Sequence, residues 1–147
     1  GEPFQGWRHM ALAKIIAGSY TGMAGVTSGG SYCDSEYDFG VNAPKSRIEG
    51  AGWALSYFNN SSTHPNVYNT NYTNWFTVGT NDGQFADGSL LKTSEAWNID
   101  TKMDDGAPAK GFIHSWPVCS VANDYNNFTS PYNLSDTSTL CPLLFKP

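Results

Sequence analysis

The sequence predicts an α+β domain in which short helices pack on an antiparallel β-sheet, with long irregular loops between them. Two segments carry apolar residues at the spacing of an amphipathic helix, and three shorter segments are rich in strand-forming residues. These segments do not alternate as strand, helix and strand, the order that builds a parallel sheet. The length of 147 residues suits one domain with a buried core, so we expect a single domain spanning residues 1–147.

The first predicted helix runs from Glu2 to Ala17, and Gly18 is expected to end it. Its apolar residues repeat at spacings of three and four: Phe4, Trp7, Ala11, Leu12, Ile15 and Ile16. After it, the stretch from Thr21 to Val41 is rich in Gly and Ser, which predicts an irregular segment.

Two strands are expected in the middle of the chain, at residues 52–58 and 74–79. In the first of them, alternation places three large side chains on one side: Trp53, Leu55 and Tyr57. The Asn-rich segment 59–74 between the strands predicts a polar loop, and Asp-Gly pairs predict turns within residues 81–89.

The second predicted helix begins at Thr93 or Ser94, either of which suits an N-cap, and its first turn carries Glu95. Gly106 supplies the left-handed residue that closes a helix, and Pro108 prevents its continuation. A third strand is expected over residues 112–118, followed by a polar loop and a tail, residues 141–147.

The composition excludes some classes of function. The chain has a net charge of −5 and only eight Lys and Arg residues, too few for the basic surface that phosphate backbones require. We therefore expect no nucleic-acid binding through this domain. No stretch approaches the length of apolar sequence that spans a bilayer.

Cys119 and Cys141 bracket a segment rich in Asn, Ser, Thr and Tyr that has no apolar periodicity. A disulfide between them would remove much of the conformational entropy of that segment in the unfolded chain. This pairing leaves Cys33 as a lone thiol and favours an extracytoplasmic location, where disulfides persist. Three buried, reduced cysteines are the alternative.

Asp100, Asp104 and Asp105 are the candidate metal ligands, because carboxylate oxygens suit calcium and a glycine follows them. Their spacing does not match an EF-hand loop, and Lys102 adds a competing positive charge. The alternative is a solvated helix end, and Asn81, Asp82 and Asp87 form a second acidic group of the same kind.

No catalytic motif is present, and we expect no enzymatic activity and no cofactor. The histidines, His9, His64 and His114, share no short spacing with one another or with a nucleophile. The acidic surroundings of Cys33 would raise a thiol pKa. A small hydrolase would require a polar pocket with a strongly perturbed histidine or carboxylate.

Aromatic and Asn-rich loops could instead bind carbohydrate. However, all five Trp residues lie in predicted helices or strands, where packing in the core is the simpler role. Five Asn-x-Ser/Thr sequons suggest glycans in a eukaryotic secreted protein but arise readily by chance in such a chain: Asn59, Asn60, Asn71, Asn127 and Asn133.

Three stretches resemble motifs of one family. Phe4–Gly22 is similar to a helix of the form aromatic-x-x-Trp-x-His-Leu-x-Leu-Ala, and Pro44–Trp53 to a Pro-Lys-Ser-Lys-Ile lead into a strand. Glu95–Gly111 is close to Ala-x-x-Ile-Asp-x-Lys-Ile-Asp-Asp-Gly-x-Pro. In this order they resemble the globular part of type IV pilin-like proteins, including the pseudopilins of type II secretion systems.

The resemblance implies a pilin-like head that works as a structural subunit of a bacterial filament, at the periplasm or cell surface, with other pilin or pseudopilin subunits as its partners. The family's cleavage site and long apolar helix are missing here, so membrane attachment would come only through such a helix preceding Gly1. The loops 59–74 and 123–138 are expected to face outward. The alternative function is a secreted carbohydrate-binding or adhesive module.

Overall fold

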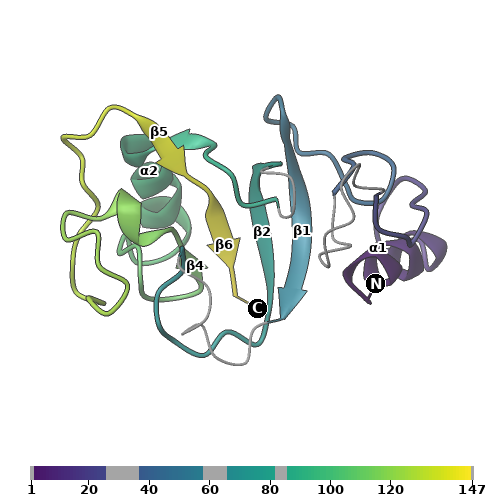
Figure 1. The fold of residues 1–147 in the computed structure, drawn as a ribbon, viewed down its shortest axis with the longest axis horizontal. Helices are drawn as coiled ribbons and strands as arrows, with labels where there is room; N and C mark the ends of the chain where they lie inside the picture. Colours follow the sequence, from purple (N-terminus) through teal and green to yellow (C-terminus); the bar gives the residue numbers. More distant parts are fainter. Residues whose placement is uncertain (1, 26–36, 58–65, 82–85, 147) are drawn as a thin grey trace.

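The computed structural model describes residues 2–25, 37–57, 66–81 and 86–146. Its centre is a four-stranded antiparallel sheet in the order β1-β2-β6-β4, and β3 pairs with β5 in a smaller sheet. The strands are β1 (Ala51–Tyr57), β2 (Asn74–Thr80), β3 (Leu91–Lys92), β4 (Ile113–His114), β5 (Thr139–Cys141) and β6 (Leu143–Phe145). Helices α1 (Glu2–Leu12) and α2 (Thr93–Met103) lie toward opposite ends of the larger sheet (Figure 1). The expected α+β class with an antiparallel sheet is confirmed.

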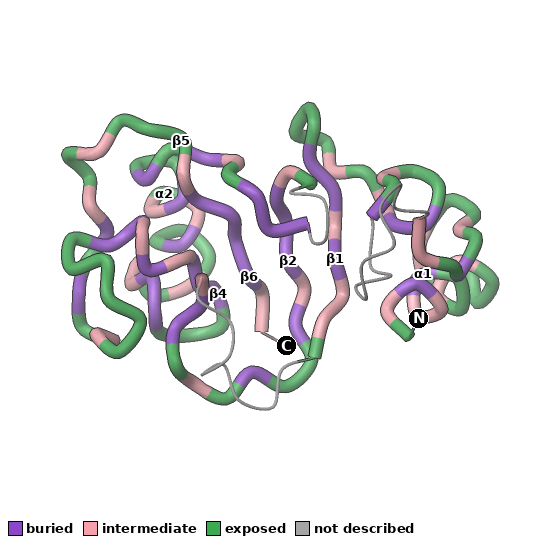
Figure 2. The backbone as a smooth tube through the Cα atoms, viewed as in Figure 1, coloured by how far each residue is buried: buried purple, intermediate pink, exposed green. Residues whose placement is uncertain are grey.

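Both faces of the four-stranded sheet carry buried side chains. Directly paired residues share a face, so Leu55, Phe76 and Phe145 lie together on the first face. Under α1 this face contributes to a core cluster that contains Phe4 and Trp7. Its other half packs under α2 through residues of β2, β4 and β6: Val78, Ile113 and Leu143. Figure 2 shows the buried residues following the strands, with exposed loops at both ends.

The second face is covered by a smaller cluster of aromatic and aliphatic residues. It contains Val67, Tyr72, Trp75 and Leu144, all buried, with Trp116 packed against them. The five Trp residues expected in the core are therefore there: Trp7 and Trp75 are buried, while Trp53, Trp97 and Trp116 are partly buried and packed against the clusters.

The prediction that α1 extends to Ala17 is wrong. The helix ends at Leu12 in a Schellman motif: Ile15 N–H donates to Met10 O at 2.9 Å, and Lys14, with φ of 58°, takes the left-handed position. Ile15 is consequently 72% exposed and does not extend the apolar face. Within the described ranges, no helix is both long and apolar enough to cross a membrane.

The strands predicted at residues 52–58 and 74–79 correspond to β1 and β2. Their predicted and observed ends agree within one residue. The aromatic face of β1 is only partly buried, because Trp53 and Leu55 pack on the core whereas Tyr57 is 62% exposed. The strand predicted at residues 112–118 is shorter than expected. Of the predicted residues, only Ile113 and His114 pair in the sheet, as β4. A 3₁₀ helix, η2 (Pro117–Cys119), follows. Pro117 has no N–H to donate to a sheet.

The tail predicted at residues 141–147 forms part of two strands. β5 and β6 are separated by Pro142, and β6 occupies an interior position between β2 and β4. Leu143 and Leu144 are 2% and 1% exposed and point to opposite faces, which explains why neither is polar. This short strand joins the two halves of the sheet.

Candidate functional site at the end of α2

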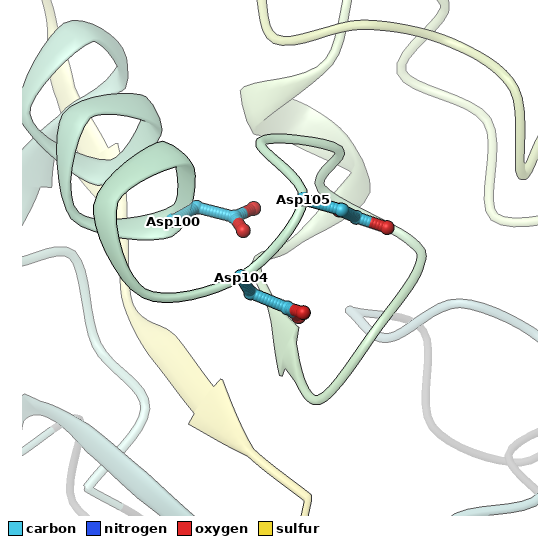
Figure 3. A group of neighbouring side chains, drawn as sticks. All are labelled: Asp100, Asp104 and Asp105. Carbon is cyan, nitrogen blue, oxygen red and sulfur yellow. The ribbon is translucent and has the colours of Figure 1, made fainter.

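The structure brings together the three aspartates that the sequence singled out. Asp100 lies in the last turn of α2 and is fully buried, Asp104 follows the helix and is half-buried, and Asp105 is exposed. One carboxylate oxygen of each lies within 4.8 Å of the others. In Figure 3, Asp100 projects from the helix toward the loop, whereas Asp105 points outward from that loop.

Asp100 is held by two hydrogen bonds from opposite directions. Gly106 N–H donates to its Oδ1 at 3.0 Å, and the Tyr132 hydroxyl donates to its Oδ2 at 2.9 Å. Tyr132 belongs to the polar segment between the two cysteines and is 4% exposed. The Asp100 carboxylate therefore ties the end of α2 to a segment more than thirty residues away.

Asp104 and Asp105 order the loop that leads from α2 to β4. Asp104 Oδ2 accepts hydrogen bonds from Phe112 N–H at 2.6 Å and Ile113 N–H at 2.8 Å. Asp105 Oδ1 accepts one from Ala107 N–H at 2.9 Å, an Asx turn. The three carboxylates thus satisfy backbone donors that the loop would otherwise leave unpaired.

The start of α2 differs slightly from the expectation. The helix begins at Thr93, but the cap is Lys92, whose N–H donates to the Glu95 carboxylate at 2.8 Å. Thr93 is fully buried instead, with its Oγ1 3.6 Å from Cys141 Sγ. Glu95 does lie in the first turn, where the helix dipole favours its charge.

Two glycines make the loop after α2 sterically feasible. Gly106 and Gly111 have φ of 72° and 69°, in the left-handed region that other residues disfavour. A Cβ at Gly111 would also overlap the Asp104 carboxylate. The Asp-Asp-Gly sequence and the later glycine are therefore requirements of one compact loop.

Gly111→Ala is expected to lower the free energy of unfolding by about 2–3 kcal/mol, because it combines left-handed strain with displacement of Asp104 from Phe112 and Ile113. Gly50→Ala is the matched control: Gly50 has φ of 74° but no atom near its would-be Cβ. It should lose only about 1 kcal/mol. Equal losses in urea denaturation of the two variants would contradict the role of Asp104.

Burial sets the electrostatics of the site. It raises the pKa of the Asp100 carboxyl to about 6, even though the hydrogen bonds from Tyr132 and Gly106 favour the charged form. Burial, with the neighbouring Asp100 charge, also raises the pKa of the Tyr132 hydroxyl, so this group stays protonated and donates. The pair is a buried polar anchor between two segments.

The donor set does not favour calcium. Calcium takes about six to eight oxygen ligands, and the Asp100 oxygens and one oxygen each of Asp104 and Asp105 already accept hydrogen bonds from the protein. A cation at this place would compete with the contacts that shape the loop. The geometry fits the alternative, a structural helix end, although one of its carboxylates is buried and not solvated.

Addition of calcium to about 1 mM, a concentration typical for extracellular calcium modules, is expected to leave the thermal unfolding midpoint unchanged. Magnesium at the same concentration controls for ionic strength. A midpoint that rises and saturates with calcium, and that no longer does so in Asp105→Asn, would restore the metal-site interpretation.

The predicted disulfide is confirmed. Cys119 and Cys141 are bonded, with Cα atoms 5.9 Å apart, and link η2 to β5. Both cysteines are fully buried in the cluster under α2. Cys33 lies outside the described residues, as do His64, Asp82 and the first two sequons, Asn59 and Asn60.

The described histidines form no catalytic arrangement. His114 is buried on β4 and lies 3.1 Å from the Tyr72 hydroxyl, a contact that joins β4 to the segment before β2. Burial lowers the pKa of His114. Neither His9 nor His114 hydrogen-bonds to a serine, threonine or cysteine side chain of the described residues.

The loops proposed for carbohydrate binding offer few exposed aromatic rings in their described parts. Tyr68, Tyr72 and Tyr132 are each at most 4% exposed, so their faces are not available for stacking on a sugar. Tyr125 is 52% exposed, and Phe128 is half-buried. The described sequon residues are Asn71, which is exposed, and Asn127 and Asn133, which are half-buried.

Comparisons of the chain with models of protein families, with curated proteins and with solved structures gave no match.

Proposed function

We propose that this chain is a structural subunit of a bacterial type IV pilus-like filament or type II secretion pseudopilus, at the periplasm or cell surface. The sequence resemblance to pilin-like heads is the starting point. Its three stretches lie in α1, in the lead into β1, and in α2 with its following loop. The proposed partners are further pilin or pseudopilin subunits.

One observation carries the proposal: each of the four acidic residues of the motif at Glu95–Gly111 accepts a hydrogen bond that shapes α2 or the loop after it. Glu95 caps α2, Asp100 anchors it to Tyr132, and Asp104 holds the start of β4. Gly106 and Gly111 permit the loop. The motif that resembles a pilin sequence therefore supports the proposal of a rigid scaffold, as a filament subunit requires.

The disulfide supports the proposed location. Disulfides persist in the periplasm and at the cell surface and are rare in the cytosol. A segment such as 120–138, cross-linked at its base and largely exposed, suits contacts with neighbouring subunits or with the surroundings.

The proposal is tested in the source bacterium by deleting the gene and labelling cell-surface filaments with an antibody raised against the purified chain. We expect labelled filaments, or type II secretion, to be lost on deletion and restored by the intact gene. Complementation with Asp105→Ala should also restore them, since that residue is exposed, whereas Asp100→Ala should not. An antibody that labels only the cytoplasm, with filaments and secretion unchanged by deletion, would overturn the proposal.

A further inference from the structure

A pocket of about 430 Å³ opens beside α1 on the first face of the sheet. We call it the aromatic pocket; the side chains that define it are Trp7, Tyr20, Lys45, Trp53, Phe76 and Phe145. Its volume falls in the range of small-molecule sites, and its walls are mostly apolar. It lies where the cluster under α1 meets the cluster under α2, because Trp53 packs against both.

The aromatic rings stand in two tilted pairs. Trp7 and Phe76 have ring centroids 5.8 Å apart at 49°, and Trp53 and Phe145 have centroids 5.7 Å apart at 46°. Trp53, Phe76 and Phe145 come from three neighbouring strands and are only partly buried. Apolar ring surface is therefore left accessible on a rigid sheet, in a position to hold a flat apolar group.

The charged side chain of the aromatic pocket is a cation. Lys45 is exposed, and its ammonium forms no ion pair with a carboxylate of the described residues. Trp7 is 4% exposed, and its indole Nε1 is itself buried, so only the ring of Trp7 contributes to the pocket wall. The Tyr20 hydroxyl already donates to Ala17 O.

No carboxylate or amide side chain lines the aromatic pocket. A neutral sugar needs both donors and acceptors for its hydroxyl groups, whereas a carboxylate only accepts. A ligand with a flat apolar body and one carboxylate matches both the apolar walls and the Lys45 ammonium. The positive charge at Lys45 adds electrostatic complementarity to such an anion.

We propose that the aromatic pocket binds a small organic acid, with its ring against the aromatic side chains and its carboxylate on Lys45. The ligand class is an aromatic acid, a flat apolar ring that carries one carboxylate. This inference goes beyond the filament role and does not depend on it, since binding is measured on the purified chain.

The test is a ligand-observed NMR titration of the purified chain with two aromatic acids, indole-3-acetate and phenylacetate. Each acid is paired with its neutral counterpart, indole-3-ethanol or 2-phenylethanol. We expect at least one acid to bind more tightly than its neutral counterpart, and the difference to shrink at high salt.

Lys45→Met should weaken binding of that acid about three- to fivefold, the size expected for an exposed ion pair, while Lys45→Arg retains it. Lys102→Met, an exposed lysine on α2, is the matched control and should bind as the parent chain does. The proposal is overturned if no acid binds, if the neutral counterparts bind equally well, or if Lys45→Met has no effect. It is also overturned if sedimentation shows a dimer that Trp53→Ala dissociates, because a second copy would then fill the aromatic pocket.

Discussion

Replacing both Cys119 and Cys141 by alanine is expected to lower the free energy of unfolding by about 3 kcal/mol. The bond closes a loop of sequence separation 22, and its loss restores conformational freedom to that segment in the unfolded chain. The folded state is destabilised as well, because both sulfur atoms are buried among Ala96, Ile113 and Leu143 and their removal leaves a cavity. Urea denaturation of the parent and double variant, both without reductant, measures the loss.

The disulfide can also be tested by counting the free thiols of the chain. Of the three cysteines two are bonded, so thiol titration of the denatured, unreduced chain should find one thiol, that of Cys33. Three titratable thiols in freshly purified protein, or a double variant as stable as the parent, would contradict the structural role of the bond.

Asp100→Ala is expected to cost about 3 kcal/mol of unfolding free energy. It removes the acceptor of both the Tyr132 hydroxyl and Gly106 N–H, and each buried donor left without a partner costs about 1–3 kcal/mol. Asp100→Asn keeps an acceptor oxygen in nearly the same shape and should lose less. Asp105→Ala is the control, because that side chain is exposed and makes one local hydrogen bond. Similar losses for Asp100→Ala and Asp105→Ala would refute the anchor.

The raised pKa of Asp100 has a further consequence for the pH dependence of stability. The folded-state pKa of about 6 lies above the ordinary value of 3.8 for an aspartate, so the native chain binds more protons than the unfolded chain between these values. The contribution of Asp100 to the free energy of unfolding therefore falls as pH rises from about 4 to about 6, by roughly 2 kcal/mol in all.

His114 acts in the opposite sense over a neighbouring window. Its pKa is lowered by burial, so the unfolded chain binds more protons below pH 6.5 and stability rises with pH there. The two effects are separated by subtracting the pH profile of Asp100→Asn from that of the parent chain. A difference profile that is flat from pH 4 to 6 would show that the Asp100 pKa is not raised.

Local sequence signals were sufficient for the elements that carry their own pattern. The alternation and β-forming residues of β1 and β2 located both strands within a residue, whereas Gly106 placed the end of α2 only approximately, because the helix ends at Met103 with Asp104 as its C-cap. The cysteine pairing followed from the character of the segment between them. The aspartate cluster was also identified, because a helix end and a tight turn keep Asp100, Asp104 and Asp105 close whatever the rest of the fold does.

Signals that depend on distant partners were missed. α1 ends at Leu12, with Lys14 and not Gly18 as the left-handed residue that closes it, since the apolar side chain of Ile15 has no core to pack against and the Schellman motif is satisfied locally. The tail gave no periodic pattern because β6 has only three residues and both of its faces are buried. Its place in the sheet comes from pairing with β2 and β4.

The amino-acid sequence by itself determined the α+β class, the disulfide, the acidic character and the absence of a local catalytic motif. These follow from composition, short-range periodicity and residue chemistry, which act within a few residues of each other. The tertiary structure alone decided that Asp100 is buried against Tyr132, that β6 completes the sheet, and that Trp7, Lys45 and Phe145 meet at one pocket. Those juxtapositions join residues far apart along the chain, and only the packing of the whole core fixes them.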